Sequence, residues 1–178
     1  MPKRTLAVLL LLAALATSGC GYALVGRASN VPDDVRAVYV EPLDNRTSRS
    51  QVDQFVTRAI ADELVTRQRF QVLSSESGAD AVISGAVTAF AVTPVAFDDQ
   101  GRATEYEIVI RAAMEFARVP VGEEDEGEVL WSNNSYVFRE NYPLDLSDLE
   151  YFDREDLALE EAAQSFAETM VSDLLEGF

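Results

Sequence analysis

Few side chains in this sequence have the types and spacing that enzyme chemistry requires. The 178 residues include no histidine and one cysteine, Cys20, and they contain no glycine-rich phosphate loop. This excludes Ser-His-Asp triads, Cys-His pairs and zinc sites with histidine ligands. A glycosidase needs only two carboxylates, but among 31 acidic residues some lie close together by chance. We expect no catalytic residue, metal or cofactor; an enzyme would show hydrolytic activity that is lost on replacing Asp98, Asp99 or Glu105.

The chemistry expected of Cys20 is lipid attachment. Residues 1–19 begin with two basic side chains, continue with an apolar run over 6–16, and end in small residues. This order is typical of an export signal, and the run is shorter than the about 20 residues that span a bilayer. The residues before Cys20 resemble a lipobox, although Thr17 stands where leucine is usual. We predict that Cys20 becomes the acylated N-terminus; the alternative is a secreted protein cut near the end of the apolar run.

The acidic balance limits the partners of the mature chain. Residues 20–178 have 12 basic and 31 acidic side chains, a net charge of −19. This opposes nucleic-acid binding and any broad attraction to anionic lipid surfaces. The acidic run over 122–127 lacks the spaced ligands of a calcium loop, so we interpret it as a solvated loop rather than a cation site.

The elements that must position any functional residue follow from hydrophobic spacing. A helix is predicted from Ser50, with Asp53 three residues on, to near Gln68, and a second helix from Asp153 with an apolar stripe from Leu159 to Leu174 before Gly177. Short strands are predicted over 36–41 and 70–73, with loops over 42–50 and 74–80. Further strand material is predicted over 128–131 and 135–142, around the polar residues 132–134.

The clearest pattern predicts a long hairpin. Residues 81–97 form a valine-rich extended run, 98–102 a turn, and 104–119 a second strand in which alternate residues from Tyr106 to Phe116 share one face. Pro94 cannot donate to a ladder, so a bulge or an edge is expected there. Because each arm is long for a globular strand, we expect the tip of the hairpin to project.

The predicted order of elements gives a fold class. We expect an α+β two-layer sandwich, with two helices on one face of a mixed, mostly antiparallel β-sheet that includes the long hairpin. We divide the chain into a signal peptide over 1–19, a lipidated N-terminus and tether over 20–35, and a single domain over 36–178.

Four segments, in order along the mature chain, carry a resemblance to a known family. They are Cys20-Gly-Tyr-Ala-Leu24, Val38-Tyr-Val-Glu-Pro-Leu-Asp-Asn-Arg-Thr47, Gly101-Arg-Ala-Thr-Glu-Tyr-Glu-Ile108, and Tyr136-Val-Phe-Arg139 followed by Tyr142, an acidic linker and a final helix. Together they resemble the lipopolysaccharide-assembly lipoproteins of the LptE family.

This resemblance implies a location, partners and a role. LptE proteins are not enzymes; they are anchored in the inner leaflet of the outer membrane and plug the LptD β-barrel, which inserts lipopolysaccharide. In well-studied Gram-negative bacteria an Asp after the lipidated Cys retains a lipoprotein in the inner membrane, and Gly21 is not that signal. We therefore expect an outer-membrane protein, lipid-anchored on the periplasmic side, with an LptD-like barrel and lipopolysaccharide as partners. The hairpin tip, namely Phe97, Asp98, Asp99, Gln100 and Gly101, is the candidate barrel-facing segment.

One departure from the family bears on lipid binding. The best-studied members contact lipopolysaccharide through basic side chains, one of them just before the hairpin-turn Gly, where this chain has Asp98-Asp99-Gln100. The resemblance therefore transfers the plug role better than lipid binding. Arg102, the only cation in the turn, and Arg139 are the candidate lipopolysaccharide contacts.

A second family remains an alternative. The stretch over 40–47 also resembles the opening strand of curli-secretion and peptidoglycan-synthase-activator lipoproteins. That alternative predicts a ring of copies, or binding to a synthase, instead of a one-to-one plug.

Overall fold

The computed structural model describes residues 31–120, 122, 127–143 and 151–176, with only the backbone described over 151–156. Cys20, the predicted signal peptide, most of the tether and most of the acidic run lie outside the described residues. The elements are β1 (Ala37–Val40), β2 (Asp44–Asn45), α2 (Val52–Thr66), β3 (Gln71–Leu73), β4 (Ala81–Phe97), β5 (Ala103–Arg118), β6 (Val129–Pro143) and α3 (Tyr151–Glu176).

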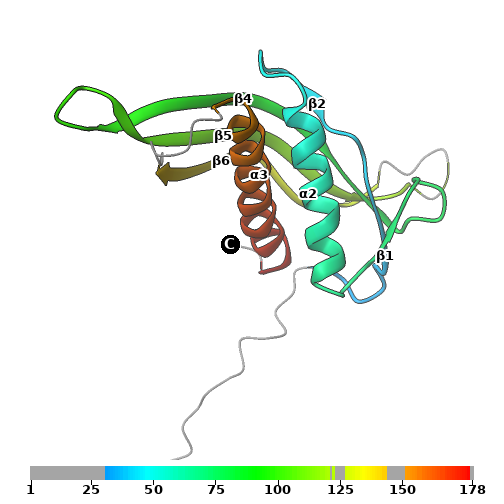
Figure 1. The fold of residues 1–178 in the computed structure, drawn as a ribbon. Helices are drawn as coiled ribbons and strands as arrows, with labels where there is room; N and C mark the ends of the chain where they lie inside the picture. The colour runs from blue at the N-terminus through cyan, green and yellow to red at the C-terminus, as the bar shows by residue number, and fades with distance from the viewer. Residues whose placement is uncertain (1–30, 121, 123–126, 144–150, 177–178) are drawn as a thin grey trace, which may run out of the picture.

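Over the described ranges the strands form one mixed sheet in the order β3-β1-β4-β5-β6 (Figure 1). β1 runs parallel to β3 and to the start of β4, and β2 pairs parallel with β4 just beyond β1. The long strands β4, β5 and β6 are antiparallel to one another. The sheet is therefore parallel at one side and antiparallel at the other.

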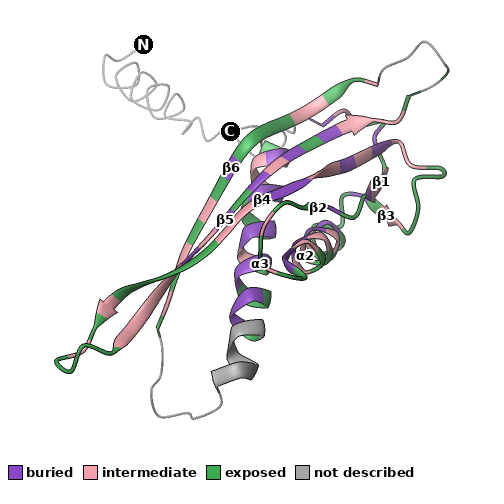
Figure 2. Ribbon diagram, turned by 90° about the horizontal axis from the view of Figure 1, so that it is seen from above, coloured by how far each residue is buried: buried purple, intermediate pink, exposed green. Residues whose placement is uncertain are grey.

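Both helices lie side by side on one face of this sheet (Figures 1 and 2). α2 buries Val52, Val56, Ile60 and Leu64, one residue per turn, because apolar side chains at this spacing share a helix face. The predicted stripe of α3 is likewise buried; its members are Leu159, Ala163, Phe166, Met170 and Leu174. The predicted fold class, two helices on one face of a mixed sheet, is confirmed.

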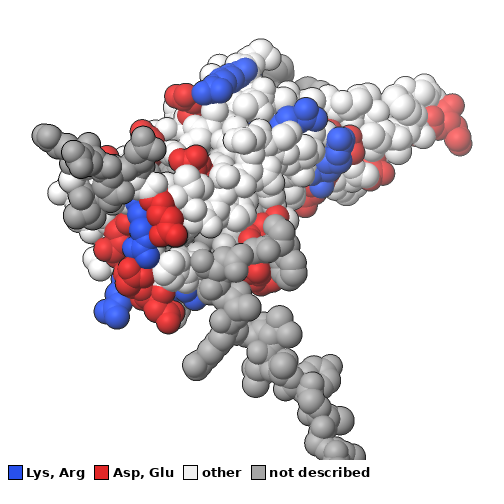
Figure 3. All heavy atoms as spheres, turned by 180° about the vertical axis from the view of Figure 1, so that it is seen from behind, with Lys and Arg blue, Asp and Glu red and all other residues white. Residues whose placement is uncertain are grey.

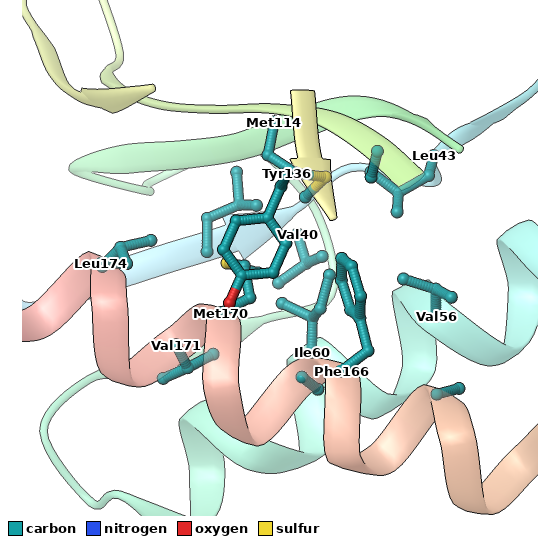
Figure 4. Packing of buried hydrophobic residues seen from close by; sticks show 14 of the residues in the cluster. Val40, Leu43, Val56, Ile60, Met114, Tyr136, Phe166, Met170, Val171 and Leu174 are labelled. Atoms are coloured by element: carbon teal, nitrogen blue, oxygen red, sulfur yellow. The ribbon is translucent and has the colours of Figure 1, made fainter. Parts of the chain in front are cut away.

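The core between the layers is apolar and tightly interleaved (Figure 4). Alternate residues of β5 face the helices and are buried, from Ile108 to Phe116, as period-two spacing requires. On β6 the same alternation sends Tyr136 and Phe138 toward Phe166 of α3, with ring centroids 5.4 and 6.1 Å away. Burial, followed by a hydrogen bond with Asp173, raises the pKa of the Tyr136 hydroxyl.

Four local predictions need correction. Ser50 is not the N-cap of α2; the N-cap is Gln51, which has the left-handed conformation (φ 66°) and makes no capping hydrogen bond through its side chain. The predicted loop over 42–50 contains the short strand β2. The two pieces predicted around 132–134 form the single strand β6, in which Ser132 and Asn133 pair with β5 and the register shifts at Asn134 and Ser135. α3 begins at Tyr151, before Asp153.

Candidate interaction surface

The hairpin of β4 and β5 projects beyond the helices as an arm (Figures 1 and 2). Past Val87, where β2 ends its pairing, β4 pairs with β5 alone among the described strands. The register shifts between Pro94 and Ala96, so both expectations for Pro94, a bulge and an edge, are confirmed. The side chains of Val92, Val95 and Phe97 are 38%, 46% and 59% exposed, so the arm offers apolar area to a partner.

The turn at the tip of the arm is built on Asp98. Its Oδ1 accepts the backbone N–H groups of Gln100 and Arg102, each at 2.9 Å, and its Oδ2 accepts Nε of Arg102 at 2.8 Å. The backbone hydrogen bond from Arg102 is the main cause that lowers the pKa of Asp98. Gly101 has φ +77°, which favours glycine. The tip is therefore a preorganised turn with an ionised carboxylate.

The internal ion pair changes what Arg102 can offer a ligand. Its side chain is 59% exposed, so it remains accessible, but its Nε is held by Asp98. An anionic ligand at the tip would compete with that carboxylate and would also meet Asp99, which is exposed beside it. Binding of a lipid phosphate by Arg102 therefore stays a prediction, and the phosphate would have to compete with these carboxylates.

The face of the sheet opposite the helices is uncovered by any described element and is seen in Figure 3. On β5 it carries the residues that alternate with the buried ones, among them Glu107, Val109 and Arg111. Arg139 of β6 lies directly across from Val109, and its Nη1 is 3.5 Å from Oε1 of Glu107. Figure 3 shows cationic side chains near the root of the arm, a largely uncharged arm and an acidic tip.

Arg111 was not among the residues singled out in the sequence, yet the fold places it beside Arg139. It pairs across the strands with Ala89 of β4 and Val137 of β6, so it is diagonal to Arg139. Its side chain is exposed and makes no ion pair or hydrogen bond with the described residues. The alternating pattern of β5 predicts the face on which Arg111 lies. That Arg139 is its neighbour depends on the register between β5 and β6, which the sequence does not show.

A hollow of about 290 Å³ lies at the other end of the same face, where β1 gives way to β2. Gly85, Ala86 and Ala113 contribute backbone and small side chains, and Glu41, Pro42, Asp44 and Arg46 line the rest. The hollow shares Ala113 with the face that carries Arg111 two residues earlier. It is open and of mixed charge, which favours a contact surface over an enclosed ligand site.

The Asp44-Asn45-Arg46-Thr47 stretch has a structural role. Oδ1 of Asn45 accepts the backbone N–H of Thr47 at 2.9 Å, and Nδ2 of Asn45 donates to Oδ1 of Asp53 in the first turn of α2 at 3.0 Å. Asn45 thus ties the end of β2 to the start of the helix.

The root of the hairpin is held by charged side chains. Arg118 contacts Asp34 at 2.9 Å and Glu128 at 3.2 Å. The hydrogen bond with Asp34 is the main cause that raises the pKa of Arg118 and lowers that of Asp34. These pairs join the segment before β1 to the ends of β5 and β6.

Among the residues that the structure describes, no three His, Cys, Asp or Glu side chains gather closely enough to hold a metal ion. None of the described helices is both long enough and apolar enough to cross a membrane.

A family model described as "LptE: Lipopolysaccharide-assembly" matches residues 35–174. Among curated proteins, none matches the chain.

Solved structures show the same fold at low sequence identity. A protein of Chlamydia trachomatis is 10% identical with a TM-score of 0.51, the match covering 80% of this chain and 96% of that one. A protein of Xanthomonas campestris is 12% identical with a TM-score of 0.50, covering 82% and 88%. The rare lipoprotein B of Shewanella oneidensis is 15% identical with a TM-score of 0.47, covering 74% and 92%. At such identities the first two likenesses concern the fold alone.

Proposed function

The chain belongs to the LptE family of lipopolysaccharide-assembly lipoproteins, and from that premise we propose that it is a non-catalytic plug of an LptD-like outer-membrane β-barrel. We propose further that residues 1–19 are removed, that Cys20 is acylated, and that residues 20–35 tether a domain over 36–178 to the periplasmic side of the outer membrane. The lipopolysaccharide that such a barrel inserts is the second partner.

The observation that carries this proposal is the projecting arm. A 17-residue strand and a 16-residue strand are joined by a turn in which Asp98 accepts three hydrogen bonds, and the outer part of the arm is not needed to cover the core. Exposed apolar side chains on a projecting element mark contact sites for other molecules. A plug has to reach into the barrel interior, and the arm has the shape and the exposed apolar side chains for that contact.

Co-purification tests the proposal. The full chain is expressed in its native membrane, extracted with mild detergent and captured through a C-terminal tag, and the captured barrel is identified by mass spectrometry. We expect a one-to-one complex by native mass. Absence of any LptD-like barrel from an intact native membrane contradicts the plug, and a ring of copies supports the curli-secretion type of lipoprotein instead.

A matched pair of variants locates the contact on the arm. Phe97 at the tip is 59% exposed and Val65 on the helix side is 58% exposed, so both can be changed without loss of core packing. We expect Phe97→Asp to reduce barrel capture several-fold, because it places a charge in an apolar contact, and Val65→Asp to leave it unchanged. Equal capture of the barrel by both variants would show that the tip of the arm is not the contact site.

A further inference from the structure

The open face of the sheet contains an arginine, Arg111, whose side chain makes no ion pair with any residue that the structure describes. Arg111 is exposed, and its immediate neighbours on this face, within β5 and directly across on β4 and β6, are Val109, Ala113, Ala89 and Val137. The nearest carboxylates of β5 on the same face, Glu107 and Glu115, are four residues away. Acidic residues outnumber basic ones by 31 to 14, so a cation in uncharged surroundings stands out.

A second arginine lies diagonal to it. Arg139 is opposite Val109, which puts it one diagonal step, roughly 7–8 Å, from Arg111. Its partner Glu107 is 3.5 Å away, and the Arg139 side chain is 56% exposed; an ion pair this exposed holds its partners only weakly. Two like charges at this spacing repel each other, and an anion between them removes the repulsion.

The surface around the two arginines suits an apolar chain. Ala91 of β4 pairs with Val109 of β5, and in the next row Ala89 and Val137 lie on either side of Arg111. Val137 is 41% exposed. Small side chains on a pleated sheet leave a flat, uncharged surface beside the charges. The helix side differs, because its groove between α2 and α3 has three carboxylates, Asp62, Glu63 and Glu160, against one arginine, Arg58, and this excess would repel an anion.

We propose that Arg111 and Arg139 form a binding site for the phosphate of a phosphorylated lipid, whose acyl chain lies along Ala89, Ala91, Val109 and Val137. Guanidinium groups bind phosphate through paired, charge-assisted hydrogen bonds, and the uncharged rows bind the chain by burial of apolar surface. The choice of lipid rests on the proposed function, in which lipopolysaccharide is a partner. The inference adds the location: the open face near the root of the arm, not its acidic tip.

Binding of purified lipid A to the purified mature domain tests the site. The probes are bisphosphorylated lipid A and its dephosphorylated form in the same detergent, measured with wild type, Arg111→Gln, Arg139→Gln and the control Arg58→Gln. Arg58 is a matched control, since its side chain is 80% exposed and it has one weak pair, 3.7 Å from Asp62. We expect each of the first two variants to lose about tenfold in affinity, and Arg58→Gln to bind as wild type does.

Further variants and a competing anion separate a lipid site from a free-anion site and from loss of folding. Arg111→Lys keeps the charge but loses the planar fork, so we expect intermediate affinity, and circular dichroism checks that each variant is folded. Equal binding of both forms of lipid A, or unchanged binding by Arg111→Gln and Arg139→Gln, overturns the site. If millimolar inorganic phosphate displaces lipid A, the two arginines form a site for a free anion, and the proposal of a lipid site is wrong. Either result would leave the plug proposal standing, because that proposal is tested by barrel capture. Failure of the wild-type chain to capture a barrel would contradict the plug without affecting the lipid A result.

Discussion

At the residue scale, the carboxylate of Asp80 joins the starts of β1 and β4, which are neighbouring parallel strands. Its Oδ2 accepts the backbone N–H groups of Ala37 and Arg36, each at 2.8 Å, and these bonds, the one from Ala37 first, lower the pKa of Asp80. A carboxyl with a lowered pKa in the folded state stabilises that state above its unfolded pKa, and this contribution is lost as pH falls through the folded pKa.

We predict that Asp80→Asn lowers Tm at about pH 7 and that the difference from wild type shrinks below about pH 4. The single amide oxygen of Asn can accept both N–H groups as Oδ2 does, but it carries no negative charge, so both hydrogen bonds lose their charge assistance. Thermal unfolding followed by circular dichroism over a pH series measures the effect, with Asp33→Asn as an exposed neighbouring control. A constant difference in Tm at every pH would show that the charge of Asp80 is not what matters.

Residue types were readable from the sequence, but their partners were not. Arg102 and Arg139 were identifiable as cations near the hairpin, and they stay predictions as lipid contacts. That Arg102 is paired with Asp98, and that Arg139 has Arg111 as its diagonal neighbour, depends on turn geometry and on the register between β5 and β6. A bulge shifts that register between Ala112 and Met114, and no local sequence pattern reveals such a shift.

At the scale of elements, the close pairing of β4 with β5 depends on Gly85. A Cβ at this position would collide with the backbone O of Ala113 and crowd Met114. We predict that Gly85→Ala destabilises the domain by about 1–3 kcal/mol more than Gly78→Ala. Gly78 also has positive φ, +87°, but nothing lies within 4 Å of a Cβ there, so it controls for backbone strain.

Urea unfolding of both variants gives the comparison from the midpoint and slope. Equal destabilisation would mean that the two strands move apart at no cost and that Gly85 is not a constraint on the sheet. A lower slope for Gly85→Ala alone would indicate that the hairpin opens before the rest of the domain.

Long, strongly patterned elements were predictable, and short ones were not. The bounds of β4, Ala81–Phe97, match the predicted run because one face stays apolar for most of its length. β2 has two residues and exists only because β4 passes beside it, so no local pattern reveals it. Likewise the N-cap of α2 is Gln51, in left-handed backbone geometry, and Asn45 donates a hydrogen bond to Asp53 in the first turn; the capping preference of Ser50 does not predict this start.

At the scale of the whole molecule, the two faces of the sheet differ in their roles. The helices cover one face and supply the core, so stability resides there. The other face and the projecting arm are left for contacts. The low identity to solved structures with this fold, 10% and 12%, agrees with this division, because a core tolerates many apolar sequences of the right volume and pattern.

This division predicts that the outer arm can be removed without unfolding the domain. The variant joins Val92 to Ile108, which are paired across the hairpin, through an Asn-Gly turn, a combination that favours tight hairpins. The removed residues 93–107 include no buried side chain, and on β6 only residues 141–143 lose their paired partners, so we expect the Tm to change by only a few degrees. Because the arm is the proposed contact, we expect capture of the barrel from native membranes to fall at least tenfold. A folded, armless protein that still captures the barrel at wild-type levels would refute the arm as the plug, while its lipid A affinity should persist, since Arg111 and Arg139 remain.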